Sequence, residues 1–213
     1  MKKRFASIVL AATLAAASVP AHAAEVSANI GYMSQYIFRG IPQSTSSAMG
    51  GLDLSAGGFY LGTWGADVTE GLEIDFYGGY GFEAGDFNFS VGGTLYTYTD
   101  DFDDNYQEIN LSAGWKFLTF DAAIGTYDNF GGPKLHYQFY SVTGEYNGIY
   151  GKVGWFADDF DGTYLEGGYN GTLTIQDTDW FDYGFSVIYS DSTLLGGDSD
   201  TNFVFTVSKT FDF

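Results

Sequence analysis

The sequence has no cysteine, so disulfide bonds cannot stabilise this chain. It has only eight Lys and Arg residues against 27 Asp and Glu. That shortage of positive charge argues against binding to nucleic acid, whose phosphates require neutralisation, and against docking on an anionic membrane surface. After the N-terminal segment no apolar run is long enough for a membrane-spanning helix. Glycine (30 residues) and aromatic residues (19%) are abundant instead, a balance typical of membrane barrels with aromatic girdles and small lumen residues.

The N-terminal segment has the three parts of a secretory signal peptide. Lys2, Lys3 and Arg4 form a basic start, an apolar stretch follows from residue 5 to residue 19, and Ala21-His22-Ala23 supplies the small-x-small cleavage pattern. We therefore expect a signal peptide over residues 1–23 and one mature domain over residues 24–213, the alternative being an uncleaved membrane anchor. The mature chain then keeps five of the eight basic residues.

Apolar and polar residues alternate with a period of two along most of the mature chain, which predicts strands. In one example Leu72, Ile74 and Phe76 share a face opposite Glu73, Asp75 and Tyr77. In the first run Tyr32, Tyr36 and Phe38 share the apolar face. The runs last about 9–12 residues, the length that a tilted membrane-crossing strand needs. The pattern predicts twelve strands, at residues 26–40, 48–56, 59–68, 71–82, 87–98, 106–115, 118–127, 137–146, 149–157, 164–175, 180–190 and 202–213. Asn170-Gly171 is an alternative turn that would change this count.

The predicted connections alternate between short and long, with the short connection at Thr69-Glu70 as the one poor fit to the long set. Outer-membrane barrels have this pattern, with tight periplasmic turns and longer outer loops. The last strand ends in Phe213 after alternating apolar residues, which looks like the assembly signal of outer-membrane proteins. We therefore expect an all-β fold, a transmembrane antiparallel up-and-down β-barrel of about twelve strands in which the last strand pairs with the first.

Five short segments of the N-terminal half carry a family resemblance: residues 27–32 (SANIGY), 36–40 (YIFRG), 59–65, 72–77 and 85–87. They resemble the TorF-type porin family of proteobacteria, and the first two segments resemble the opening of those proteins. The resemblance implies an outer-membrane β-barrel of a Gram-negative bacterium and supplies no catalytic residues.

The charged and tyrosine side chains on the polar faces of the strands are the candidate pore-lining residues. They are Arg39, Glu73, Asp75, Tyr77, Tyr96, Glu108, Asp121, Glu145, Lys152 and Glu166. Six acids against two bases would make a lumen negative and favour cations. The alternative is that these groups pair with one another and plug the interior, because twelve strands lie between a filled barrel and an open one. Arg39, placed at the outer end of the first strand, could pair with Glu73 or Asp75 or bind an acidic loop, and we favour the loop.

Sites for a metal, a cofactor or catalysis have little support. Asp100, Asp101, Asp103 and Asp104 form one acidic loop cluster, but solvated surface charge accounts for it better than calcium does. His136 is the one histidine of the mature chain, and no nucleophile motif surrounds it. We expect no enzyme, no cofactor and no metal site.

The expected function is passive diffusion of small hydrophilic solutes, preferentially cations, across the cell outer membrane. The alternative is a non-conducting structural or interaction barrel whose acidic loops meet partners outside the cell. The expected partners are outer-membrane lipid and lipopolysaccharide, the barrel-assembly machinery and small solutes. Nucleic acid is not expected, and homo-oligomerisation is left open.

Overall fold

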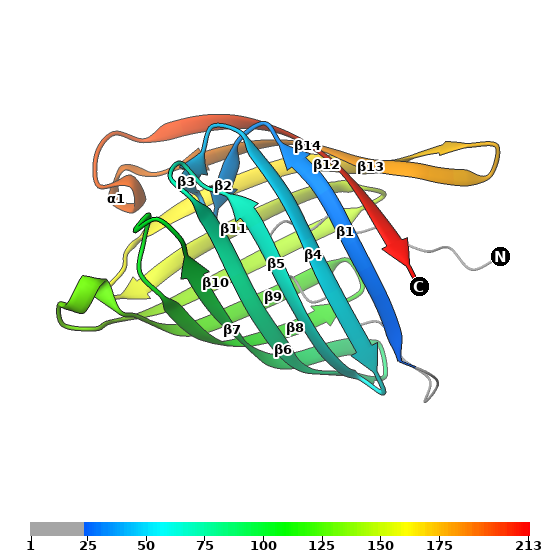
Figure 1. Cartoon of the computed structure of the whole chain (residues 1–213), viewed down its shortest axis with the longest axis horizontal. Coiled ribbons are helices and arrows are strands. Elements are labelled where there is room, and N and C mark those ends of the chain that lie inside the picture. The colour runs from blue at the N-terminus through cyan, green and yellow to red at the C-terminus, as the bar shows by residue number, and fades with distance from the viewer. Residues whose placement is uncertain (1–23) are drawn as a thin grey trace.

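The computed structural model describes residues 24–213, which form one closed antiparallel barrel of twelve strands (Figure 1). The predicted signal peptide, residues 1–23, lies outside the described residues. The wall strands are β1 (Glu25–Met33), β4 (Ser47–Ala56), β5 (Phe59–Asp67), β6 (Leu72–Ala84), β7 (Phe87–Tyr98), β8 (Tyr106–Trp115), β9 (Leu118–Tyr127), β10 (Leu135–Tyr146), β11 (Ile149–Asp158), β12 (Gly162–Ile175), β13 (Thr178–Ser190) and β14 (Asp200–Asp212).

Each wall strand pairs with its neighbour along the chain, and β14 pairs with β1 to close the cylinder. In the closing ladder Ala28 lies opposite Phe211, so the predicted pairing of the last strand with the first is confirmed. Asn170 and Gly171 lie inside β12, paired with Gly184 and Tyr183, and the alternative turn at this position is wrong. An up-and-down barrel of this kind leaves no open edge along its closed wall.

The two ends of the barrel have different connections. At one end, here the turn end, tight turns such as Asn147-Gly148 join the strands, and both residues of that turn have positive φ angles (53° and 81°). Positive φ at both central positions is what a two-residue hairpin of the favoured hand requires. At the opposite end, the loop end, the connections carry a short 3-10 helix (Asn129–Gly131) and α1 (Ser192–Leu195). None of the helices within residues 24–213 is long and apolar enough to cross a membrane.

The outer wall of the barrel carries the apolar side chains and the inner wall the polar ones. On β6, for example, Phe76 is 51% exposed, whereas Glu73 and Asp75 are 1% and 7% exposed. Ile30, Leu61 and other large apolar residues repeat the outward position around the cylinder. The predicted alternation therefore holds, with its apolar face directed away from the interior rather than into a dry core.

The prediction of a first strand over residues 26–40 is wrong from residue 34 onward. The wall strand β1 ends at Met33, and the chain then turns inward into a small antiparallel hairpin of β2 (Tyr36–Phe38) and β3 (Ile41–Ser44). We call β2 and β3 the inner hairpin. Tyr36, expected beside Tyr32 on the apolar face, is 2% exposed, because the bend at Ser34-Gln35 takes it off the outer wall.

Candidate functional site

The tip of the inner hairpin is a two-residue turn that packs against strands β12 and β13 of the wall. Arg39 and Gly40 have positive φ angles of 49° and 82°. A Cβ atom on Gly40 would lie 2.6 Å from the Cβ of Tyr164 on β12, so only glycine fits here. The hydroxyl of Ser190 on β13 donates a 2.6 Å hydrogen bond to the carbonyl oxygen of Gly40. The hairpin leaves the wall between β1 and β4, and its tip reaches β12 and β13, which lie beyond β14 in the ring of strands.

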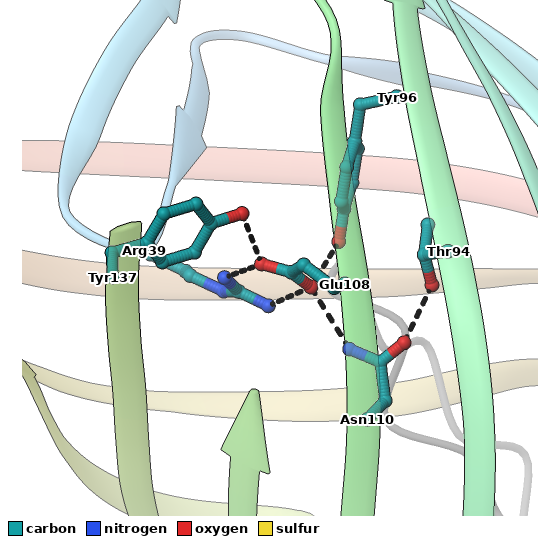
Figure 2. A network of polar contacts seen from close by, with 6 residues as sticks. All are labelled: Arg39, Thr94, Tyr96, Glu108, Asn110 and Tyr137. Atoms are coloured by element: carbon teal, nitrogen blue, oxygen red, sulfur yellow. Dashed lines mark hydrogen bonds and ion pairs between the residues drawn. The ribbon is translucent and has the colours of Figure 1, made fainter. Parts of the chain in front are cut away.

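Arg39 forms a bidentate ion pair with Glu108 of β8 inside the barrel (Figure 2). Its Nη1 and Nη2 atoms donate to the two Glu108 oxygens at 2.5 and 2.9 Å. Tyr96, Tyr137 and Asn110 also donate to this carboxylate, at 3.0, 2.7 and 2.8 Å. A buried ion pair stabilises only when additional hydrogen bonds satisfy its remaining lone pairs, and Glu108 meets that condition.

Aromatic rings complete the surroundings of the Arg39 guanidinium. Its central carbon lies 4.3 Å from the ring centroid of Phe139 and 4.8 Å from that of Phe38, within the range of cation–π attraction. Burial opposes the charge on Arg39, but the facing carboxylate of Glu108 outweighs that effect, and the pKa of Arg39 is raised. The guanidinium is therefore charged at any physiological pH and is held by Glu108, Phe139 and Phe38.

The rest of the inner hairpin packs into the loop end of the lumen. Tyr36 donates its hydroxyl proton to Glu73 of β6, and its ring meets Trp64 edge-on with centroids 5.7 Å apart. Ile37 joins an apolar cluster on the other side of the hairpin. That cluster contains Ile37, Ala123, Tyr137, Phe139, Phe156, Tyr164, Ile188 and Val204. The loop-end half of the interior is thus filled by the hairpin and the side chains around it.

The turn-end half of the interior has no such filling element among the described residues, and its tyrosines lie against the wall. Tyr77 donates a 2.5 Å hydrogen bond to Asp53, and a Cβ atom on Gly62 would meet the Tyr77 ring at 2.5 Å. The Tyr60 hydroxyl lies 2.1 Å from where Cβ atoms on Gly79 and Gly92 would be. Each of these tyrosine side chains therefore lies over a glycine of a neighbouring strand.

The remaining predicted pore-lining residues lie outside the apolar cluster around the inner hairpin. Asp121 accepts hydrogen bonds from Ser112 and Ser141 at 2.7 and 3.3 Å. Lys152 lies directly opposite Glu166 in the β11–β12 ladder, and Glu166 accepts a 2.5 Å hydrogen bond from Tyr150. Glu145 is on the same face of β10 as Ser141 but is exposed at the turn end of the strand.

The structure corrects the predicted partner of Arg39. The sequence favoured an acidic loop, with Glu73 or Asp75 as the alternative, and the partner is Glu108. Loop acids satisfy local groups instead, as in Asp103, which accepts hydrogen bonds from Tyr106 and Tyr127. His136 is exposed at the start of β10, where its backbone N–H donates to Asp159.

Sequence reasoning missed several residues that hold the inner hairpin. Tyr36 was placed on the apolar face, and neither Tyr137 nor Ser190 was singled out. One signal was available, because Arg39-Gly40 followed by Pro42 is a turn-forming sequence inside an apparently continuous strand. The partners on β10 and β13 carried no comparable signal.

Comparisons with solved structures agree with the barrel. The chain aligns with the structure of the KdgM porin with a TM-score of 0.56 and 10% identity, covering 88% of this chain and 99% of that one. It also aligns with a chain from a study of the mechanism of in-meso crystallization of membrane proteins (TM-score 0.62, 7% identity), covering 89% and 84% of the two chains. Such low identities establish a shared fold.

Comparisons of sequence give one further result. No curated protein matches the chain. Residues 17–186 match a family described as "Bacterial protein of unknown function (Gcw_chp)". The resemblance to TorF-type porins drawn from short segments stays a prediction.

Proposed function

Because this chain belongs to the Gcw_chp family of bacterial proteins of unknown function and folds as a twelve-stranded barrel, we propose that it is a narrow porin of the outer membrane. It would allow passive diffusion of small hydrophilic solutes, with a preference for cations. The observation that carries this proposal is the reversed polarity of the barrel, with apolar side chains outside and charged side chains inside.

The outer wall supports placement in a lipid bilayer. Large apolar residues such as Ile30, Leu61 and Phe76 are more than half exposed, an arrangement unfavourable in water but suited to lipid. We expect outer-membrane lipid and lipopolysaccharide to contact this wall and the barrel-assembly machinery to insert it. The tight turns would face the periplasm and the long loops the outside.

The turn-end half of the interior supports a water-filled passage. Tyr60 and Tyr77 lie over wall glycines, whereas rings directed across the lumen would fill it. Asp121, Lys152 and Glu166 lie outside the apolar cluster around the hairpin. Since Arg39 is already neutralised by Glu108, the remaining lining charge is negative and favours cations.

The inner hairpin supports a restriction to small solutes. It occupies the loop-end half, so any conducting path must pass between the hairpin and the wall. The same observation favours the second candidate function, a non-conducting structural or interaction barrel, because the Arg39–Glu108 pair joins the hairpin to the wall across the lumen.

Planar-bilayer recording of the purified protein in a salt gradient separates the two candidates. A narrow porin should give small stepwise conductances and a reversal potential of the sign that cation selectivity requires. Silence at high protein load, from protein whose barrel is folded by circular dichroism, would refute the porin and leave the structural barrel.

A further inference from the structure

Two buried carboxylates in the loop-end half have no counter-charge. Glu73 and Asp75, here the acidic pair, project from the same inward face of β6 and are 1% and 7% exposed. Glu73 Oε1 accepts the Tyr36 hydroxyl, but Glu73 Oε2 and Asp75 Oδ1 are buried without any hydrogen-bond partner among residues 24–213. A buried carboxylate oxygen without a partner is costly, so both atoms favour binding of an added hydrogen-bond donor.

The nearby bases do not neutralise the acidic pair. The ion pairs formed within residues 24–213 are Arg39–Glu108 and Lys134–Asp128, and neither involves Glu73 or Asp75. Both Nη atoms of Arg39 donate to Glu108, so its guanidinium is already committed. The contrast with Glu108 is direct: that carboxylate is equally buried and both of its oxygens are hydrogen-bonded.

Aromatic side chains surround the acidic pair. Asp75 lies opposite Trp64 on one side and Tyr96 on the other in the two adjoining ladders, and Glu73 lies opposite Tyr98. Directly opposed side chains in antiparallel strands are in contact range. The faces of Trp and Tyr rings attract cations, and carboxylates beside them attract the same ligands.

Two carboxylates beside aromatic rings favour an ammonium group over a multivalent metal ion. Calcium takes about 6–8 oxygen ligands, and within residues 24–213 no three His, Asp or Glu side chains are grouped so that they could hold a metal ion. An ammonium centre donates N–H bonds to two carboxylates and is attracted by the rings at the same time. We propose that the acidic pair binds a compact ammonium group, either the ammonium ion or the head of a small primary amine, between Glu73 Oε2 and Asp75 Oδ1.

The inference goes beyond the proposed porin function, because binding at the acidic pair does not require the lumen to conduct. Isothermal titration calorimetry on the full barrel in detergent, in amine-free phosphate buffer at constant ionic strength, tests it. Ammonium chloride and methylammonium chloride are the probes, and sodium and tetramethylammonium chlorides are the comparison salts. One saturable site per barrel is expected for the two probes and none for the comparison salts.

Three variants locate the site. Glu73→Gln and Asp75→Asn keep the side-chain volumes and remove one charge each, so they should fold and should weaken ammonium binding by at least about tenfold. Glu145→Gln removes an exposed carboxylate at the turn end and should bind as the unchanged protein does. Circular dichroism checks that each barrel is folded before titration.

Three results would overturn the site: no saturable uptake of ammonium, unchanged binding in both Glu73→Gln and Asp75→Asn, or tighter binding of tetramethylammonium than of methylammonium. These results are independent of the bilayer recordings. A barrel that binds ammonium yet never conducts would refute the porin alone, and one that conducts without binding would refute the ammonium site alone.

Discussion

The two halves of the barrel interior differ in how their polar side chains find partners. In the loop-end half, the inner hairpin brings Arg39 to Glu108 and fills the space with aromatic and aliphatic side chains. In the turn-end half, polar groups bond to near neighbours on adjoining strands, as Tyr77 does to Asp53. The loop-end half is filled through contacts between distant segments, whereas the polar groups of the turn-end half are paired within the wall. The strands are the same, so the difference comes from one inserted hairpin.

Removing the inner hairpin should make the two halves alike and should change single-channel conductance more than any other variant proposed here. Met33 and Ser47 are direct partners in the β1–β4 ladder, so an Asn-Gly turn can replace residues 34–46 without altering the wall. We expect a severalfold rise in single-channel conductance, because the loop-end half would then be as open as the turn-end half. Planar-bilayer recording measures it. A folded variant with unchanged conductance would show that the hairpin does not limit the path.

Breaking the ion pair should loosen the loop-end half while leaving the turn-end half intact. Arg39→Ala leaves Glu108 buried without its cation, which should lower the free energy of unfolding by about 3–5 kcal/mol. Denaturant unfolding followed by tryptophan fluorescence measures the change. The double variant Arg39→Met with Glu108→Leu should recover most of the loss. Lys152→Met, in the turn-end half, should cost less, and an equal cost would contradict the proposed contrast between the halves.

Adding a side chain at the hairpin tip should lower the free energy of unfolding, by less than the loss of the ion pair does. Gly40→Ala imposes a positive φ angle on a residue with a Cβ atom, which costs roughly 1–2 kcal/mol, and it adds a clash with Tyr164. Gly85→Ala is the matched control, since Gly85 also has a positive φ angle but nothing lies within 4 Å of its added Cβ. The difference in unfolding free energy between the two variants isolates the clash. Equal values would mean that the tip is not pressed against β12.

Displacing a tyrosine from the wall should have the smallest effect and act on the turn-end half. Gly62→Ala places a methyl group where the Tyr77 ring lies, so the ring must swing toward the lumen and loses its bond to Asp53. Single-channel conductance should fall by less than half, with a stability cost of about 1 kcal/mol. Gly151→Ala is the control, because its added Cβ meets nothing within 4 Å. A rise in conductance would show that the Tyr77 ring does not lie against the wall over Gly62.

The wall could be predicted from the sequence because membrane strands are long and alternate strictly. The predicted strands at 87–98, 106–115 and 118–127 coincide with β7, β8 and β9. A one-residue slip would turn every side chain to the opposite face, so burial fixes the phase strongly. The inward positions of Glu73 and Asp75 followed from the same rule.

The inner hairpin could not be predicted in this way. Tyr36 and Phe38 continue the alternation of Tyr32, and a period of two does not distinguish a strand that stays in the wall from one that bends into the lumen. The ion pair was missed for a related reason, since Arg39 and Glu108 are 69 residues apart and no local pattern links them. Long-range contacts of this kind depend on which strands face each other across the closed barrel.

The inner hairpin also has consequences for how the barrel assembles. Its hydrogen-bonded partners lie from 26 residues away, at Thr69, to 150 residues away, at Ser190. The hairpin is made near the start of the chain, but its binding surface is incomplete until β13 has joined the wall. Docking of the hairpin and pairing of β14 with β1 are therefore coupled. Both depend on contacts between residues far apart in the sequence, so we expect barrel closure to be slow. On unfolding, the hairpin contacts and the β1–β14 pairing should be lost together. The last strands therefore complete the barrel and the binding surface of the hairpin in the same step.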